Sequence, residues 1–212
     1  MKKTKKAVGI SMLAAIAFVL MAVCRIPITD FLKYEPKDIA IAIGGFIYGP
    51  LSTIVISVVV SFVEMFTLSG TGFIGFVMNV ISTSCFAFTA AYIYKNKHNL
   101  KGAVIGLITG SLLTIAVMLL WNCLITPLYM GVPREAVAKM LLPVFLPFNL
   151  LKCSLNTALT LLVYKPVVKA LRGINIIEQS NKKSKSNIGI ILASLLITAT
   201  CILVILTYNK II

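Results

Sequence analysis

The stretch Leu146-Pro147-Phe148-Asn149-Leu150-Leu151-Lys152-Cys153 places an asparagine and a lysine three residues apart in an otherwise apolar run. An ionisable side chain near the centre of a bilayer costs roughly 2.5–3.5 kcal/mol on insertion scales, so a lysine in such a run indicates a functional site and needs a partner. Residues three and four positions apart share one helical face, so Asn149 and Lys152 lie together and Asn156 continues their face at the next turn.

The rest of the chain is apolar enough to place this lysine inside a membrane. Of the 212 residues, 59% are apolar, and the mean hydropathy is +1.00. Several stretches approach the ~20 residues that cross a hydrocarbon core. We therefore expect an all-α integral membrane protein with multiple passes and no separate soluble domain.

The apolar segments can be assigned along the whole sequence. Spans or part-spans are expected over residues 7–24, 38–48, 51–68, 73–94, 102–125, 134–171 and 188–208. The Gly49-Pro50 pair marks a tight turn between the second and third segments. Pro143 and Pro147 predict an irregular start to the sixth segment, where non-helical backbone would line a cavity. We expect a six-helix membrane domain over residues 1–172, a basic cytoplasmic linker over 173–187 and an additional, peripheral transmembrane helix over 188–212.

The basic residues predict the orientation of the chain in the membrane. With the N-terminus inside, 13 of the 20 Lys and Arg residues fall on the inner side, 6 on the outer side, and Lys152 lies between them. The positive-inside rule therefore predicts a cytoplasmic N-terminus in the cell membrane. The net charge of +14 does not indicate nucleic-acid binding, because the cations cluster at the ends of segments. Loops 25–37 and 127–139 should face outside, where an external ligand would meet them first.

Several classes of site have no signature in the sequence. There is no G-x-x-x-x-G-K-[ST] phosphate loop, so we do not expect the chain to bind ATP phosphates in the usual way. The single histidine, His98, lies in a basic loop, and the acidic residues are scattered. The five cysteines lack C-x-x-C spacing and fit small apolar side chains in packed helices. We expect no enzymatic activity, no metal site and no cofactor.

What remains is a set of polar residues in or near the membrane: Glu64, Asn79, Asn122, Asn149, Lys152 and Asn156. Some of them have a purely structural interpretation. Asn79 and Asn156 could bridge helices through hydrogen bonds, and Trp121 beside Asn122 could anchor the chain at the interface. Glu64 could pair with Lys152 or lie near the outer surface. We favour a site role for Lys152, because its position in the middle of a helix is far from either surface.

As a pocket, these residues would suit a planar heterocycle. Asparagine supplies a donor and an acceptor, lysine supplies only donors, and nearby aromatic rings supply flat apolar faces. The aromatic residues concerned are Trp121, Tyr129, Phe145 and Phe148. A ring edge with alternating C=O and N–H groups would match this set. A single lysine supplies too little positive charge to bind a multiply charged phosphate.

Four motifs in order resemble a known family. They are FLKYEPKDI at 31–39, GFIYGPL at 45–51, WNCLITPLYMG at 121–131 and LPFNLLK at 146–152. Together they are similar to the riboflavin-specific substrate-binding subunits, or S components, of energy-coupling factor (ECF) transporters. The resemblance spans roughly residues 5–171.

The resemblance implies a six-helix, N-in subunit that binds riboflavin with high affinity and mediates its uptake together with a transmembrane coupling protein and two ATPases. It implies that Asn122, Asn149 and Lys152 contact the edge of the flavin ring. The predicted ligand-binding set is completed by Asn79, Glu64, Trp121, Asp38 and Tyr34. The chain departs from the family in its segment 188–208 and in the charge at Glu64.

A stripe of small residues on the first span is the predicted partner surface. Ala7, Ser11 and Ala15 recur every four residues, a pattern that allows another helix to approach closely. The stripe could contact the coupling protein or pack inside the bundle.

Other functions are also compatible with the sequence. The same architecture could bind another vitamin, such as folate or pantothenate. The chain could also be a stand-alone transporter with Glu64 and Lys152 as a proton relay, or a structural membrane protein whose polar residues only join helices.

Overall fold

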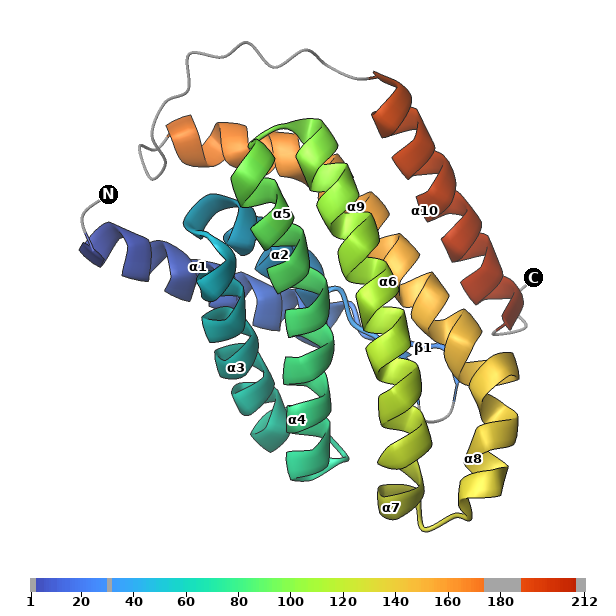
Figure 1. Cartoon of the computed structure of the whole chain (residues 1–212). Helices are drawn as coiled ribbons and strands as arrows, with labels where there is room; N and C mark the ends of the chain where they lie inside the picture. The colour runs from blue at the N-terminus through green and yellow to red at the C-terminus, as the bar shows by residue number, and fades with distance from the viewer. Residues whose placement is uncertain (1–2, 30–31, 174–187, 209–212) are drawn as a thin grey trace.

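In the computed structural model, which describes residues 3–29, 32–173 and 188–208, helices form a bundle with one further helix at its edge (Figure 1). The long helices are α1 (Lys3–Val23), α3 (Pro50–Thr67), α6 (Leu100–Leu124), α9 (Leu146–Gly173) and α10 (Ile188–Tyr208). A further long helix is continuous through α4 (Gly72–Thr83), the π-helical η1 (Ser84–Phe88) and α5 (Thr89–Lys97). The predicted linker 173–187 lies almost entirely outside the described residues.

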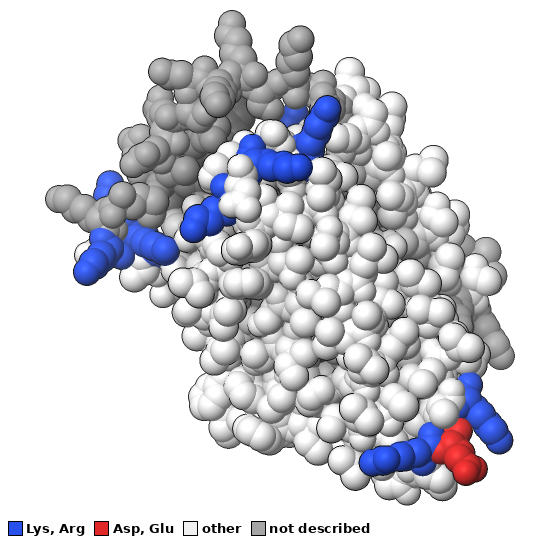
Figure 2. All heavy atoms as spheres, in the orientation of Figure 1, with Lys and Arg blue, Asp and Glu red and all other residues white. Residues whose placement is uncertain are grey.

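Six helices of the described chain are long and apolar enough to cross a membrane. Figure 2 shows that charged side chains gather at two ends of one face and leave an uncharged band between them. Large apolar side chains such as Leu51, Phe66 and Leu112 are exposed, as expected for a surface that contacts lipid. The prediction of an all-α, multi-pass membrane protein is therefore confirmed.

The short helix α2 (Lys37–Tyr48) lies at the centre of the bundle. All of its twelve residues except Ile47 are buried, and it packs against α1, α3, α5 and α9. Twelve residues extend about 18 Å, well short of the ~30 Å hydrocarbon core. The charged residues at its N-terminus, Lys37 and Asp38, therefore lie inside the protein and not at its surface.

Two regions differ from the sequence-based prediction. Between α1 and α2, where we expected a loop, Ile26–Pro27 (β1) and Lys33–Tyr34 (β2) form a small antiparallel sheet in which Ile26 pairs with Tyr34. The span predicted over 73–94 contains the π-helical segment η1, which its sequence does not signal.

The sixth predicted span is interrupted as its prolines suggested. It begins with α8 (Arg134–Met140), which follows the short α7 (Thr126–Met130), and continues through the π-helical η2 (Leu141–Phe145) into α9. A proline cannot donate the backbone hydrogen bond of a regular helix, and Pro143 lies within η2. The irregular turn directly precedes the part of α9 that carries Asn149 and Lys152.

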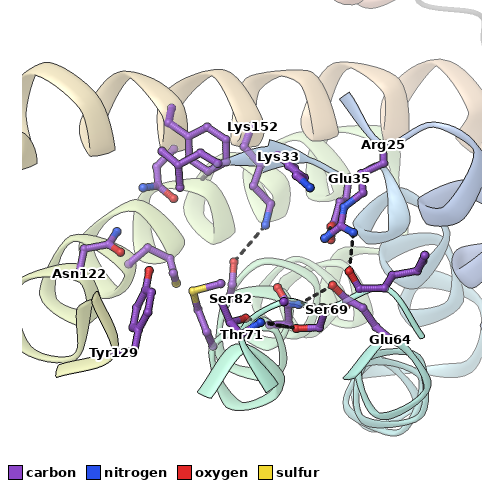
Figure 3. A pocket seen from close by; sticks show the side chains of 18 residues that line it. Arg25, Lys33, Glu35, Glu64, Ser69, Thr71, Ser82, Asn122, Tyr129 and Lys152 are labelled. Carbon is purple, nitrogen blue, oxygen red and sulfur yellow. Dashed lines mark hydrogen bonds and ion pairs between the residues drawn. The ribbon is translucent and has the colours of Figure 1, made fainter. Parts of the chain in front are cut away.

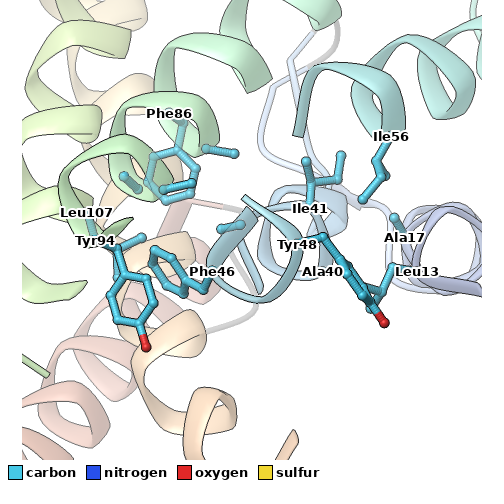
Figure 4. Close-up of a cluster of buried hydrophobic side chains, with 14 of the residues drawn as sticks. Leu13, Ala17, Ala40, Ile41, Phe46, Tyr48, Ile56, Phe86, Tyr94 and Leu107 are labelled. Carbon is cyan, nitrogen blue, oxygen red and sulfur yellow. The ribbon is translucent and has the colours of Figure 1, made fainter. Parts of the chain in front are cut away.

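The core lies around α2 and includes side chains of α1, α3, η1 and α5 and of the first turns of α6 (Figure 4). Gly106 and Gly110 let α6 approach closely, because a Cβ atom there would lie 2.6 Å from the Ala90 carbonyl oxygen and 2.5 Å from that of Phe86. Close to the far end of α2 from Lys37, Phe46 contacts the rings of Tyr94 and Tyr164, whose hydroxyls hydrogen-bond to each other. This packing holds α5 and α9 against the C-terminal end of α2, with α6 packed on both, and the cavity lies toward the other end of α2.

Candidate functional site

A cavity of about 310 Å3 lies between α3, α4, α6, α9 and the β1–β2 sheet (Figure 3). This volume is at the lower end of the range typical of small-molecule sites. The walls combine charged, amide, hydroxyl and apolar side chains. They are Arg25, Leu32, Lys33, Glu35, Glu64, Leu68, Ser69, Gly70, Thr71, Met78, Asn79, Ser82, Met118, Asn122, Tyr129, Phe148, Asn149 and Lys152.

Lys152 extends from α9 into this cavity. Its Nζ donates a hydrogen bond to Ser82 Oγ at 3.4 Å and lies 3.6 Å from Asp38 Oδ2. The ion-pair partner of Lys152 is thus Asp38, and the Glu64–Lys152 pair that the sequence left open as one alternative is not formed. The sequence could not reveal this pairing, because it depends on the depth at which the short α2 begins.

Behind Lys152, a network of buried polar groups links four elements, β2, α2, α4 and α9. Asp38 accepts hydrogen bonds from Thr83 Oγ1 at 2.6 Å and from Asn156 Nδ2 at 3.0 Å. Asn156 Oδ1 in turn accepts a hydrogen bond from the Tyr34 hydroxyl at 2.8 Å. Burial, and then the charge of Asp38, raise the pKa of Tyr34, so its hydroxyl remains a donor. Tyr34 and Asp38 were predicted to bind the ligand, but both lie outside the cavity lining and support Lys152 from behind.

Asn149 and Asn122 line the cavity as the sequence predicted, and both are buried. Asn149 Nδ2 donates to the carbonyl oxygen of Phe145 at 2.8 Å, which orients the amide and leaves its oxygen free to accept a hydrogen bond. Asn122 Oδ1 accepts a hydrogen bond from Thr126 Oγ1 at 3.0 Å. Its amide nitrogen is then available as a donor.

The aromatic residues divide into two groups. Tyr129 and Phe148 line the cavity, as expected for flat apolar walls. Trp121 and Phe145 lie outside the lining, and Phe145 belongs to the buried core. For Phe145 and Phe148 the sequence did not separate these groups, because Phe145 lies in the π-helical turn η2 and Phe148 in the regular helix that follows.

Glu64 belongs to a separate network of charges at the wall of the cavity. The buried Lys37 forms ion pairs with Glu64 and, at 3.0 Å, with Glu35 Oε2. Asn79 Nδ2 donates to both carboxylate oxygens of Glu64, at 3.0 and 2.9 Å. Arg25 contacts Glu35 Oε1 at 2.8 Å and donates to the carbonyl oxygen of Leu68 at 2.7 Å.

Two acids and two cations in this network neutralise each other. Burial raises the pKa of the Glu35 carboxyl, but the charges of Lys37 and Arg25 together outweigh burial, so this pKa lies below its ordinary value. Sequence reasoning missed Arg25, Glu35 and Lys37 as site residues, although Glu35 and Lys37 lie in the motif at 31–39. It counted Arg25 and Lys37 only as cations of an outer loop.

The cavity has two chemically different ends (Figure 3). Asn122 and Tyr129 lie on one side, Arg25, Glu35 and Glu64 lie on the other, and Lys152 reaches between them toward Ser82. One end thus offers amides and an aromatic ring, and the other offers carboxylates and hydroxyl groups. An elongated ligand with one flat end and one polar end would match this arrangement.

The small-residue stripe of α1 is exposed in the described structure. Ala7, Ser11 and Ala15 all lie on the surface, whereas the opposite side of α1, including Leu13 and Ala17, is buried. Ser11 and Ala15 border an apolar groove of about 260 Å3 whose other wall comes from α3. Internal packing therefore does not explain the stripe.

Comparison with known proteins gives consistent matches over most of the chain. Residues 5–164 match the family described as "ECF transporter, substrate-specific component". The riboflavin transporter FmnP of Bacillus subtilis (strain 168) is 30% identical over 190 residues, covering 82% of this chain and 99% of the relative. The riboflavin transporter RibU of Staphylococcus aureus (strain TCH60) is 28% identical, covering 82% and 96% of the two chains.

A solved structure is similar as well. It is described as the S component of a bacterial ECF transporter, and it superposes with a TM-score of 0.68 at 26% sequence identity. The match covers 81% of this chain and 99% of that one. The family match ends at residue 164, before α10 begins.

Proposed function

Because the chain belongs to the family of substrate-specific components of ECF transporters, we propose that it is a riboflavin-binding membrane subunit that mediates vitamin uptake. It is a transport protein and not an enzyme. The observation that carries the ligand assignment is the position of Lys152, which extends into the cavity beside Asn149 and between the two chemically different ends.

The charge balance of the cavity favours an uncharged ligand. Of the cations that line the cavity, Arg25 is paired with Glu35, Lys152 is paired with Asp38, and Lys33 is exposed to solvent. A buried cation that already has a carboxylate partner gains little from a second one. Riboflavin carries no charge near neutral pH, whereas folate and pantothenate carry carboxylates. This balance supports riboflavin over the two alternative vitamins.

We assign the flat part of riboflavin to the end of the cavity that holds Tyr129, Phe148, Asn122 and Asn149. There the ammonium of Lys152 and the amide of Asn122 would donate to ring carbonyls, and the free oxygen of Asn149 would accept from the ring N–H. The hydroxylated side chain of riboflavin would then extend toward the opposite end, where Ser69, Thr71, Glu35 and Glu64 line the wall.

A stand-alone proton-coupled carrier is not supported by the contacts. Such a relay would need Glu64 and Lys152 to exchange a proton, yet Glu64 pairs with Lys37 and Lys152 pairs with Asp38. We propose instead that uptake is driven by an ECF module composed of a transmembrane coupling protein and two ATPases. With a cytoplasmic N-terminus, the cavity would face outside and α1 would present Ala7, Ser11 and Ala15 to the coupling protein.

Isolation of the protein tests the ligand assignment. Expressed with riboflavin in the medium and purified in detergent, the chain should be yellow and show flavin absorption bands. The ligand-free form, prepared from riboflavin-starved cells, should quench the fluorescence of added riboflavin to a stoichiometric end point. Proton-driven uptake by the purified chain alone in vesicles, without bound flavin, would instead indicate a self-sufficient carrier.

A further inference from the structure

The helix α10 lies beyond the part of the chain that the family match covers, yet it packs directly along α9 (Figure 1). Its buried residues, Ser194, Cys201 and Ile205, fall on a single stripe. Residues on its other faces are exposed, and Leu196 retains 70% of its accessible surface. One side of α10 therefore contacts the protein and the rest faces lipid.

The C-terminal part of this stripe contacts the segment between α1 and α2 as well as α9. Cys201 and Ile205 form a buried apolar cluster with Leu155 of α9 and with Ile28 and Tyr34. Ile28 directly follows β1, and Tyr34 ends β2, so α10 covers the back of the β1–β2 sheet.

The front of the same sheet lines the cavity. Successive side chains of an extended segment point to opposite sides, and Lys33 and Glu35, on either side of Tyr34, are both lining residues. The Tyr34 side chain lies on the other side, against α9 and α10, where its hydroxyl donates a hydrogen bond to Asn156 Oδ1. One extended segment is therefore held by α10 on one side and faces the ligand site on the other.

The contact between α10 and Tyr34 is linked to Lys152 by two hydrogen bonds and an ion pair. Tyr34 donates to Asn156, Asn156 donates to Asp38, and Asp38 pairs with Lys152. Tyr34, Asn156 and Asp38 are all buried. The geometry of this hydrogen-bonded series therefore depends on the packing around Tyr34.

We propose that Cys201 and Ile205 of α10 are positioning residues, which hold the β1–β2 sheet against α9 and thereby fix Lys33, Glu35 and Lys152 around the ligand. The α10 helix thus supplies a packed protein surface behind the cavity wall. Only the identity of the ligand in this inference rests on the proposed function.

Hydrogen exchange of the ligand-free full-length protein tests the inference without any ligand. In Ile205→Ala, amide hydrogens of β1 and β2 should exchange faster, while those of α5 and α6 keep their wild-type rates. Leu196→Ala is the matched control, because it removes the same number of atoms from a lipid-facing position of the same helix. Ile205→Leu, which restores the apolar volume, should return exchange toward the wild-type rate.

Riboflavin release provides the functional measurement. Ile205→Ala should release bound riboflavin about three- to tenfold faster than wild type, and Leu196→Ala should not. Equal exchange and release rates in Ile205→Ala and Leu196→Ala would overturn the inference. If wild-type protein does not bind riboflavin, the proposed function fails, but the exchange experiment still decides whether α10 positions the sheet. Uniformly faster exchange across all helices of Ile205→Ala would also contradict the positioning role of α10, because such a result would show general destabilisation.

Discussion

Lys152 Nζ of α9 lies 3.6 Å from Oδ2 of Asp38, the second residue of α2. Because α2 is too short to cross the bilayer, its first turn begins at the depth of the cavity and brings a carboxylate to a lysine that would otherwise lack a counter-ion. Asp38 is buried and is also held by Thr83 and Asn156. The cation that we assign to the ligand is thus oriented by a preformed buried network.

The stability of the protein should depend strongly on the charge of Lys37, which pairs with two buried carboxylates in the adjacent network. Replacing Lys37 by Met leaves Glu35 and Glu64 buried without their shared cation, which should lower the free energy of unfolding by about 3–5 kcal/mol. Thermal unfolding in detergent would measure the loss as a lower midpoint. Lys139→Met, at an exposed position of α8, is the control and should change stability by less than about 0.5 kcal/mol. Equal midpoints for the two variants would show that the buried network contributes little.

The lowered pKa of Glu35 predicts a specific pH dependence. A carboxyl whose pKa is lower in the folded state stabilises the protein above its ordinary pKa of 4.5, and this contribution disappears as the pH falls from there through the lower folded value. Below pH ~4.5, Glu35→Gln should therefore lose stability less steeply than wild type. Unfolding at a series of pH values would measure the difference, with exposed Glu135→Gln as the control. Parallel curves for wild type and Glu35→Gln would contradict the pairing of Glu35 with Lys37 and Arg25.

Much of the fold could be predicted from the sequence, because hydrophobic length and proline position are local signals. The irregular start of the sixth span followed from Pro143, and the central candidates Asn149, Lys152, Asn122 and Asn79 do line one cavity. Their shared location was predictable because intramembrane polar groups are costly and therefore face the interior of the bundle.

The pairing of charges could not be predicted in the same way. It depends on how deep α2 begins and on how the segment between α1 and α2 folds against the bundle, and both are consequences of tertiary packing. The sequence therefore left a Glu64–Lys152 pair open, could not show that Tyr34 and Asp38 lie behind the cavity lining, and treated Lys37 as a loop cation, although its side chain is only 1% exposed. The π-helical turns, which decide that Phe148 and not Phe145 lines the cavity, also lacked a reliable local signal.

The exposed stripe of α1 predicts a surface for the coupling protein. Ala15→Trp should prevent close approach of a partner helix and abolish riboflavin uptake in cells that express the ECF module, while riboflavin binding by the purified subunit stays unchanged. Leu112→Trp, which introduces the same bulk at an exposed position of α6, should leave uptake intact. A parallel loss of binding and uptake in Ala15→Trp would show that the stripe acts inside the subunit.

Removal of α10 should leave the bundle folded. A chain that ends after Gly173 keeps α2 and its surrounding core, so it should still bind riboflavin, with faster release because the back of the β1–β2 sheet is uncovered. Size-exclusion chromatography and fluorescence titration would measure folding and binding. Aggregation of the shortened chain, or complete loss of binding, would show that α10 is integral to the six-helix domain.

Two variants at Lys152 test whether this lysine binds the ligand or only pairs with Asp38. Lys152→Met should bind riboflavin about tenfold to a hundredfold more weakly, because a buried acceptor of the ligand loses a charged donor. It should also lower the stability of the ligand-free protein, because Asp38 is left without its cation. The double variant Asp38→Asn/Lys152→Met removes both charges and should recover stability but not affinity.

Fluorescence quenching of riboflavin by the purified wild type and both variants would give the affinities, and thermal unfolding of the ligand-free proteins would give the stabilities. Weak binding that persists in the stabilised double variant is the predicted result, and it would identify Lys152 as a ligand contact. Wild-type affinity in either variant would show that Lys152 does not contact the ligand and is only the structural partner of Asp38.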